Sequence, residues 1–254
     1  MSSGHILLLL LLVRASFCFI LDGRIVKLTS SESDKQDTFK GSIVETQSIK
    51  NGQFHSDLII DFLLSEEPAN EYMKVLLVEK HNKYRRKVRA TNMKMMRWSE
   101  GLAISAQRHA NACDFRHSKG RRNVGENIWA APYSNYTEAV RLWFEEVSKP
   151  QCRCDDAFNY CCGHYLQVVW SKTDKVGCGY ARCRDIWGIK YSTYRHIFVC
   201  HYNPRGNTII FNGAGLVFRV PAFKRATNTS DQCSECPAEA PACEDGLCYD
   251  PFFK

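Results

Sequence analysis

The chain has 254 residues, a formal net charge of +7 and 13 cysteines. About 160 of these residues are available for a folded domain, which can bury roughly 70% of its unfolded surface, and this excludes a small scaffold held by disulfides alone. Clustered cysteines also argue against the reducing cytosol and favour a disulfide-bonded, secreted protein.

The N-terminus resembles a secretory signal peptide. Ile6 to Val13 is a short apolar run, and Ser16-Phe17-Cys18 offers small residues for cleavage. The run is too short to cross a bilayer. We therefore predict a signal peptide over 1–18, whose removal leaves 12 cysteines, an even number. No later segment is apolar for long enough to span a membrane, so we expect a secreted, extracellular product without a transmembrane segment.

Residues 19–69 are mostly polar, with one apolar patch from Leu58 to Leu64. We interpret this segment as a pro-segment or extended arm that is largely disordered. Whether it is removed, and whether the patch docks on the folded domain, stays open.

The folded domain is predicted over 70–225. Apolar residues recur at helical spacing from about Asn70 to Val88, and Ser99 and Thr137 are candidate N-caps of a second and a third helix. A short helix is expected over Tyr165–Trp170. Strands are expected over Lys175–Arg182 and His196–Tyr202. Helices with a small antiparallel sheet predict an α+β layered fold.

A cysteine-rich tail is predicted over 226–254. It contains four cysteines within sixteen residues and too little apolar material for a core of its own, so disulfides must hold it. These cysteines are Cys233, Cys236, Cys243 and Cys248.

Two stretches carry a family resemblance: Gly163-His-Tyr-Leu-Gln-Val-Val-Trp170 and Phe198-Val-Cys-His-Tyr-Asn-Pro-Arg-Gly-Asn207. They resemble the two signature motifs of the CAP superfamily, which comprises cysteine-rich secretory proteins, antigen 5 and pathogenesis-related proteins. The resemblance covers roughly Asn70 to Cys248 and is nearest to the glioma-pathogenesis-related and peptidase-inhibitor branches. It implies a CAP-type α-β-α sandwich followed by a truncated hinge.

The resemblance also implies a central cleft lined by four residues. By motif match these are His117, Glu126, Glu146 and His164. Glu146 is preferred over Glu145 because it lies on nearly the same helix face as Trp143. Imidazole nitrogens bind Zn²⁺, and a neighbouring carboxylate can fix the tautomer, so His117 and His164 are candidate ligands of a weak, water-completed zinc site.

Several functions fit this cleft. We expect a binding protein rather than an enzyme, with an extracellular protein, a lipid or a sterol as partner and no nucleic acid. A protease that uses His117, Glu126 and either Ser118 or a metal-bound water is one alternative, although sequence neighbours at a helix end do not usually face each other. A peptidase inhibitor presenting the segment Cys152–Cys162 is the other. Leu166 replaces the family's usual Thr, and we place it beside the cleft rim.

The resemblance further implies the disulfides Cys113–Cys183, Cys178–Cys200, Cys233–Cys243 and Cys236–Cys248. The remaining cysteines form two close pairs, Cys152 with Cys154 and Cys161 with Cys162. Bridges within such pairs are strained, so they should run between the pairs, either crossed or nested.

The sequence has three further features. Asn135-Tyr-Thr and Asn228-Thr-Ser are glycosylation acceptors in a secreted chain. Basic residues cluster around Arg86 and around Arg121; a solvated face is the simpler interpretation, and an anionic glycan is a possible partner. The motif His81-Asn82-x-x-Arg85 matches the family and is assigned a structural role, tying the first helix to the sheet.

Overall fold

The computed structural model describes residues 62–150, 162–190, 193–211 and 217–253, and the backbone of four earlier strands. The chain divides into two compact units, Met1–Asp61 and Phe62–Lys254. The second unit therefore begins before the predicted Asn70.

The first unit contains a four-stranded antiparallel sheet in sequential order. Its strands are β1 (Ser16–Leu21), β2 (Arg24–Thr29), β3 (Ile43–Lys50) and β4 (Gln53–Ile60). This differs from the largely disordered segment that we expected. The physical reason is local composition, since β-branched residues such as those of Ile43-Val44 and Ile59-Ile60 favour strands within a segment that is polar on average. The predicted cleavage point after Cys18 falls within β1.

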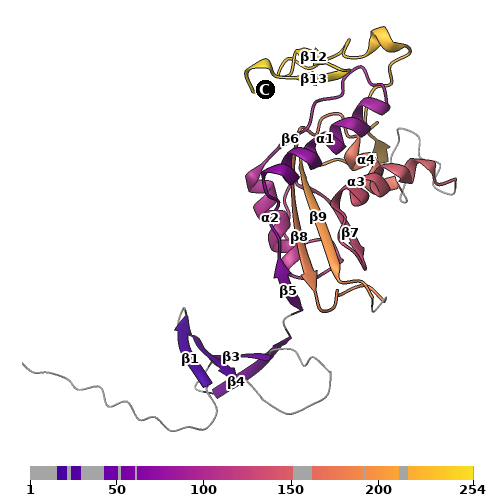
Figure 1. Cartoon of the computed structure of the whole chain (residues 1–254). Coiled ribbons are helices and arrows are strands. Elements are labelled where there is room, and N and C mark those ends of the chain that lie inside the picture. The colour runs from indigo at the N-terminus through magenta and orange to yellow at the C-terminus, as the bar shows by residue number, and fades with distance from the viewer. Residues whose placement is uncertain are drawn as a thin grey trace, which may run out of the picture. The chain divides into compact units, whose positions relative to one another are not determined.

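The second unit is built on a five-stranded sheet (Figure 1). Its path runs β5 (Leu63–Glu66), β8 (Lys175–Cys183), β9 (His196–Asn203) and β7 (Gly125–Ala131), all antiparallel, and β6 (Arg97–Trp98) pairs in parallel with β8. The two strands that the sequence predicted are the central β8 and β9. The flanking β5 and β7 were not predicted as strands.

The helices begin and end close to their predicted positions. They are α1 (Glu71–Lys87), α2 (Glu100–Asn111), α3 (Tyr136–Glu145) and α4 (Gly163–Val168), and α3 continues into a 3₁₀ turn over Glu146–Ser148. Ser99 precedes α2 as predicted, without a capping side-chain bond. The N-cap of α3 is Asn135, not Thr137, because the Asn135 side chain accepts the backbone N–H of Glu138.

Two hydrophobic cores lie on opposite faces of the sheet, which gives the predicted α-β-α sandwich. On β9, Ile197 and Val199 join Ala106 and Ala110 of α2 in one core. The alternate residues of β9 join the other core with side chains of α1, α3 and α4. The glycines of β8 let α2 approach the sheet, because a Cβ at Gly179 would lie 2.3 Å from the Gln107 backbone.

The α1 motif is buried and structural, as predicted. The two ring nitrogens of His81 form hydrogen bonds, Nδ1 with the carbonyl of Leu77 and Nε2 with the hydroxyl of Tyr202 on β9. The guanidinium of Arg85 is fully buried and donates only to main-chain carbonyls. These carbonyls belong to Lys94, Val168, Trp170, Ser171 and Thr173.

The tail depends on contacts with the rest of the domain as well as on the predicted disulfides. It contains a short hairpin of β12 (Ala242–Glu244) and β13 (Leu247–Tyr249), preceded by the hairpin β10 (Ile209–Phe211) and β11 (Val217–Arg219). Cys248 exchanges backbone hydrogen bonds with Met93 and Met95, and the Leu247 side chain is fully buried in the main core. Main-chain pairing and apolar burial therefore supplement the disulfides here.

Four disulfides join described residues: Cys113–Cys183, Cys178–Cys200, Cys233–Cys243 and Cys236–Cys248. These are the pairs that the resemblance implied. Cys162 is also disulfide-bonded. Cys152, Cys154 and Cys161 lie outside the described residues, so their pairing stays a prediction. None of the helices among the described residues is both long and apolar enough to cross a bilayer.

Candidate functional site

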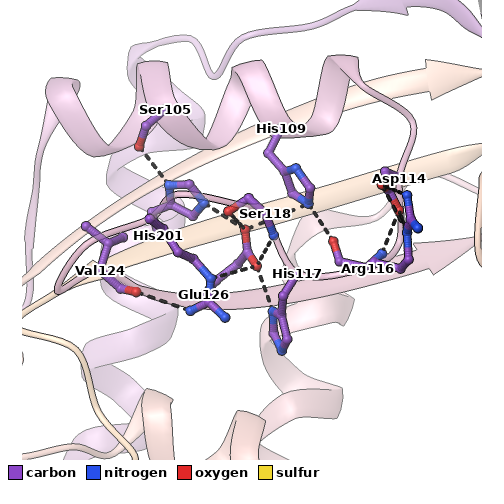
Figure 2. Close-up of polar contacts among 10 residues, drawn as sticks. Ser105, His109, Asp114, Arg116, His117, Ser118, Val124, Glu126 and His201 are labelled. Atoms are coloured by element: carbon purple, nitrogen blue, oxygen red, sulfur yellow. Dashed lines mark hydrogen bonds and ion pairs between the residues drawn. The ribbon is translucent and has the colours of Figure 1, made fainter.

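The first histidine–carboxylate group is centred on Glu126 of β7 (Figure 2). The Glu126 carboxylate has no exposed surface and lies on the α2 side of the sheet. His117 donates Nδ1–H to it at 2.6 Å, and Ser118 donates both its backbone N–H at 3.0 Å and its hydroxyl at 2.6 Å. His201 lies directly opposite Glu126 on the paired strand β9 and donates Nε2–H to the carboxylate at 3.0 Å. Glu126 thus anchors the loop that carries His117.

These donors decide the ionisation of Glu126. Burial opposes the charged form, yet the hydrogen bonds from His117, His201 and Ser118 together outweigh burial and hold the pKa of Glu126 far below its ordinary value. A carboxylate that stays charged accepts from every donor around it and fixes which nitrogen of each imidazole carries a proton.

The second group pairs Glu146 with His164. Glu146 opens the 3₁₀ turn after α3, and its carboxylate accepts the backbone N–H groups of His164 and Tyr165, each at 3.1 Å. It also accepts Nδ1–H of the His164 ring at 2.7 Å. Glu145 instead pairs with Arg141 on the surface, so the structure places Glu146, not its neighbour, at His164.

Both cleft histidines share one electronic arrangement. In each, Nδ1–H is held by a carboxylate, so Nε2 of the neutral ring carries a lone pair. The side chain of His117 is 59% exposed and that of His164 is 38% exposed. These rings are therefore accessible Lewis bases with a fixed orientation.

A polar cavity of about 380 Å³ lies beside the first group. Its lining includes His117, Arg121, Glu126, Gln167 and Asn207. The Asn207 side chain donates to the carbonyl of Gly163, and Asn127 donates to the carbonyl of His164, at 2.9 and 3.1 Å. The backbone of the second group is thus tied to the wall of this cavity and to β7.

The two groups do not form one compact metal cage. In the part of the chain that the structure describes, no three ligand atoms of His117, Glu126, Glu146 and His164 lie within 4.8 Å of one another. The three cysteines that do meet this distance, Cys233, Cys236 and Cys248, are committed to disulfides. These four residues therefore do not form a closed structural zinc site with three or four protein ligands.

Sequence reasoning missed three residues of the Glu126 group: His201, Ser105 and His109. Ser105 Oγ of α2 lies 2.7 Å from Nδ1 of His201. His109 of α2 donates Nε2–H to the carbonyl of Arg116 at 2.8 Å and lies 3.8 Å from Glu126. The usable signal was strand alternation, since His201 lies two residues after the α2-facing Val199.

The hydroxyls near this group bear on the protease alternative. Ser118 Oγ donates to the same carboxylate that holds His117. This serine and this histidine therefore both donate hydrogen bonds to Glu126 and do not form a nucleophile–base pair with each other. Ser105, His201 and Glu126 do follow the order of a Ser–His–acid chain, but His201 is only 3% exposed. This burial is typical of a clamp that joins α2, β9 and β7.

Comparisons with known proteins place this geometry in a family. Residues 78–202 match the model of the cysteine-rich secretory protein family, named CAP. Protein lon-1 of Caenorhabditis elegans is 53% identical over 210 residues, which cover 82% of this chain and 67% of lon-1. The chain belongs to the CAP family. Peptidase inhibitor 16 of Mus musculus is 35% identical over 182 residues, which cover 69% of this chain and 33% of that protein. The CAP chain described here thus spans about a third of that relative.

Solved structures show the same fold. A crystal structure of NaASP2 with Zn²⁺ has a TM-score of 0.55 at 22% identity, covering 72% of this chain and 98% of that one. The structure of BmVAL-1 has a TM-score of 0.54 at 26% identity, covering 72% and 96%. These matches confirm the CAP-type α+β sandwich.

Proposed function

We propose that this CAP protein is a secreted binding protein whose cleft holds a divalent cation such as Zn²⁺ through His117 and His164. The observation that carries this proposal is the shared arrangement of the two rings. Each donates Nδ1–H to a carboxylate and leaves Nε2 accessible, as metal-binding histidines do. The bound cation would offer a coordination position to an oxygen or nitrogen of a partner.

Extracellular location is part of the proposal and is supported by the covalent structure. The four disulfides between described residues need an oxidising compartment. Asn135 and Asn228 are both exposed, and each uses its Oδ1 as a helix cap. A glycan attached at Nδ2 leaves that acceptor in place, so both acceptor sites are compatible with glycosylation.

Titration calorimetry with ZnCl₂ tests the metal site. The wild-type protein should bind Zn²⁺ weakly, and His117→Ala or His164→Ala should each weaken binding at least tenfold, because only two protein ligands are present. His196→Gln is the matched control, since it removes an imidazole of β9 outside the cleft and should leave binding unchanged. Equal binding by all four proteins would refute the site.

A second candidate function is lipid binding, favoured by two adjoining cavities, of which the larger has a mostly apolar lining. One of about 470 Å³ lies between the segment before α1 and the start of α2, lined by residues such as Trp98 and Ile104. The other, of about 180 Å³, lies against Leu77 of α1 and Phe198 of β9. Pro68, Ala69 and Cys178 line both. A fatty acid or sterol has the apolar surface that such cavities accommodate.

Ala69→Trp places a bulky side chain in the shared wall of these cavities. It should abolish displacement of a fluorescent fatty acid or sterol, whereas Val75→Trp, on a 63% exposed position of α1, should not. If both variants bind the probe like the wild type, these cavities do not take lipid.

The protease and inhibitor alternatives are tested together. A peptide library should remain uncleaved by the wild type and by Ser105→Ala, Ser118→Ala and His117→Ala; cleavage by the wild type that is lost in these variants would make the protein an enzyme. Inhibition of a protease panel would instead favour an inhibitor, whose predicted loop lies mostly outside the described residues.

A further inference from the structure

The two basic clusters of the sequence have different environments in the structure. On α1, Arg85 is buried, Arg86 Nε lies 3.9 Å from the Asp245 carboxylate, and Lys87 lies over the rings of Tyr84 and Phe144. Arg85, Arg86 and Lys87 of that cluster therefore have contacts within the domain, whereas Lys83 and Arg89 are exposed. In the loop after α2, Lys119 and Arg122 are exposed, and the Arg116 side chain is 57% exposed. The second cluster therefore presents its cations to solvent along one continuous loop.

This second loop lies against the loop that follows β8. The disulfide Cys113–Cys183 joins their starts, and Asp114 and Trp187 form an isolated parallel β-bridge. The N–H of Phe115 donates to the carbonyl of Trp187 at 2.9 Å, and the N–H of Trp187 donates to the carbonyl of Cys113 at 2.8 Å. The two loops thus form one rigid platform.

The platform combines positive charge with exposed aromatic rings. Residues 114–122 contain four cations and one anion, and the carboxylate of that anion, Asp114, is occupied by the guanidinium of Arg116. Trp187 is 57% exposed and Phe115 is 38% exposed. The Arg116 guanidinium lies 5.4 Å from the Trp187 ring centre, so cation and ring are presented together. The buried Glu126 adds no exposed negative charge.

We propose that this platform, formed by residues 114–122 and 184–190, binds a sulfated polysaccharide. Cations suit sulfate groups, and an exposed indole face suits the C–H face of a sugar ring. Disulfides indicate a compartment outside the cytosol, and the anionic leaflet of the membrane faces the cytosol. A sulfated glycan therefore fits the compartment of this protein better than an acidic lipid surface does.

The platform is also connected to the cleft. His109 donates to the carbonyl of Arg116 and lies 3.8 Å from Glu126, which holds His117 (Figure 2). The sulfated chain and a ligand of the cleft would therefore be held at neighbouring positions on one rigid frame.

Heparin affinity chromatography and binding isotherms at 0.1 M salt test the proposal. Lys119→Ala/Arg122→Ala and, separately, Trp187→Ala should each weaken heparin binding roughly fivefold and lower the eluting salt concentration. The charge-matched control is Lys83→Ala/Arg89→Ala on exposed positions at α1, which should elute like the wild type.

Three results would overturn the proposal. An equal loss in both double variants would mean that only net charge matters. An unchanged Trp187→Ala variant would mean that the ring takes no part. Binding to phosphatidylserine vesicles without retention on heparin would identify a lipid surface instead. Thermal melting of each variant verifies that it folds, and desulfated heparin verifies that sulfate is recognised.

Discussion

Two groups of buried polar residues hold this fold together, and they differ in what they leave accessible. The α1 group of His81 and Arg85 is closed: both residues are 0% exposed, and they form hydrogen bonds to main-chain carbonyls and one tyrosine hydroxyl. The Glu126 group is equally buried at its carboxylate, but one of its donors, His117, keeps most of its ring exposed. The closed group serves structure, whereas the open one supports an accessible imidazole.

The two groups are connected through β9 and β7. Tyr202 donates its hydroxyl to His81 and accepts from Asn127, whose amide also donates to the carbonyl of His164. Glu126 and His201 lie on the opposite face of the same two strands. Changes in the closed group should therefore cost global stability, and changes at the accessible ring should cost only ligand binding.

The largest expected effect comes from Arg85→Ala. The substitution removes a donor from five buried carbonyls and opens a cavity, so the free energy of unfolding should fall by about 4 kcal/mol. Burial lowers the pKa of Arg85 to about 9, so the group is still charged at neutral pH. Urea denaturation at pH 7.5 measures the loss. A cost below about 1 kcal/mol would contradict a structural role.

Glu126→Gln should have the next largest effect. Four donors converge on the carboxylate, and an amide would turn its own NH₂ toward some of them, so a loss of about 3 kcal/mol is expected. The matched control is Glu145→Gln, which removes an exposed surface pair and should cost less than about 1 kcal/mol. Equal losses in the two variants would show that Glu126 is not a structural centre.

The pH dependence of stability tests the closed group together with His196, whose pKa burial also lowers. Burial lowers the pKa of His81 to about 4, below its ordinary 6.5, so the unfolded chain binds more protons between these values. Stability is thus fully present above pH 6.5 and is lost as pH falls toward 4, by about 2 kcal/mol between pH 7.5 and 5. The pKa of Glu126 is lowered below its ordinary range, so it adds no slope in this window.

His81→Gln checks the assignment, because glutamine takes up no proton in this range. The free energy of unfolding is measured for both proteins at pH 7.5 and pH 5. The difference between the two pH values should be about 2 kcal/mol smaller in the variant than in the wild type. A slope that is unchanged in the variant would assign the pH dependence to other groups.

Much of this organisation was predictable from local pattern. Helical spacing together with the family resemblance favoured Glu146 over Glu145, and the periodicity of α1 gave the bounds of that helix within about two residues. The four disulfides between described residues followed from the family resemblance. Features that depend on residues close in the sequence were thus predicted.

Features that depend on distant pairing were missed. Gly125-Glu126-Asn127 has the composition of a turn, and its pairing with β9 makes it a strand, so His201 was not recognised as the partner of Glu126. Leu166 was placed beside the cleft rim, yet it is fully buried in the core. The tail was expected to depend on disulfides, yet Leu247 packs in the main core because β13 pairs with the segment at Met93–Met95.

The smallest expected effect on stability is that of His117→Ala, and it sharpens the comparison most. The ring is largely exposed and Glu126 keeps its bonds to Ser118 and His201, so the free energy of unfolding should change by less than about 1 kcal/mol. The rise in melting temperature caused by Zn²⁺ should nevertheless disappear, since a ligand stabilises only the state that binds it. Thermal melts with and without ZnCl₂ measure both quantities. If the variant loses several kcal/mol of stability, His117 has a structural role like that of the closed group. If the variant keeps the Zn²⁺ response, His117 is not a ligand of the metal site.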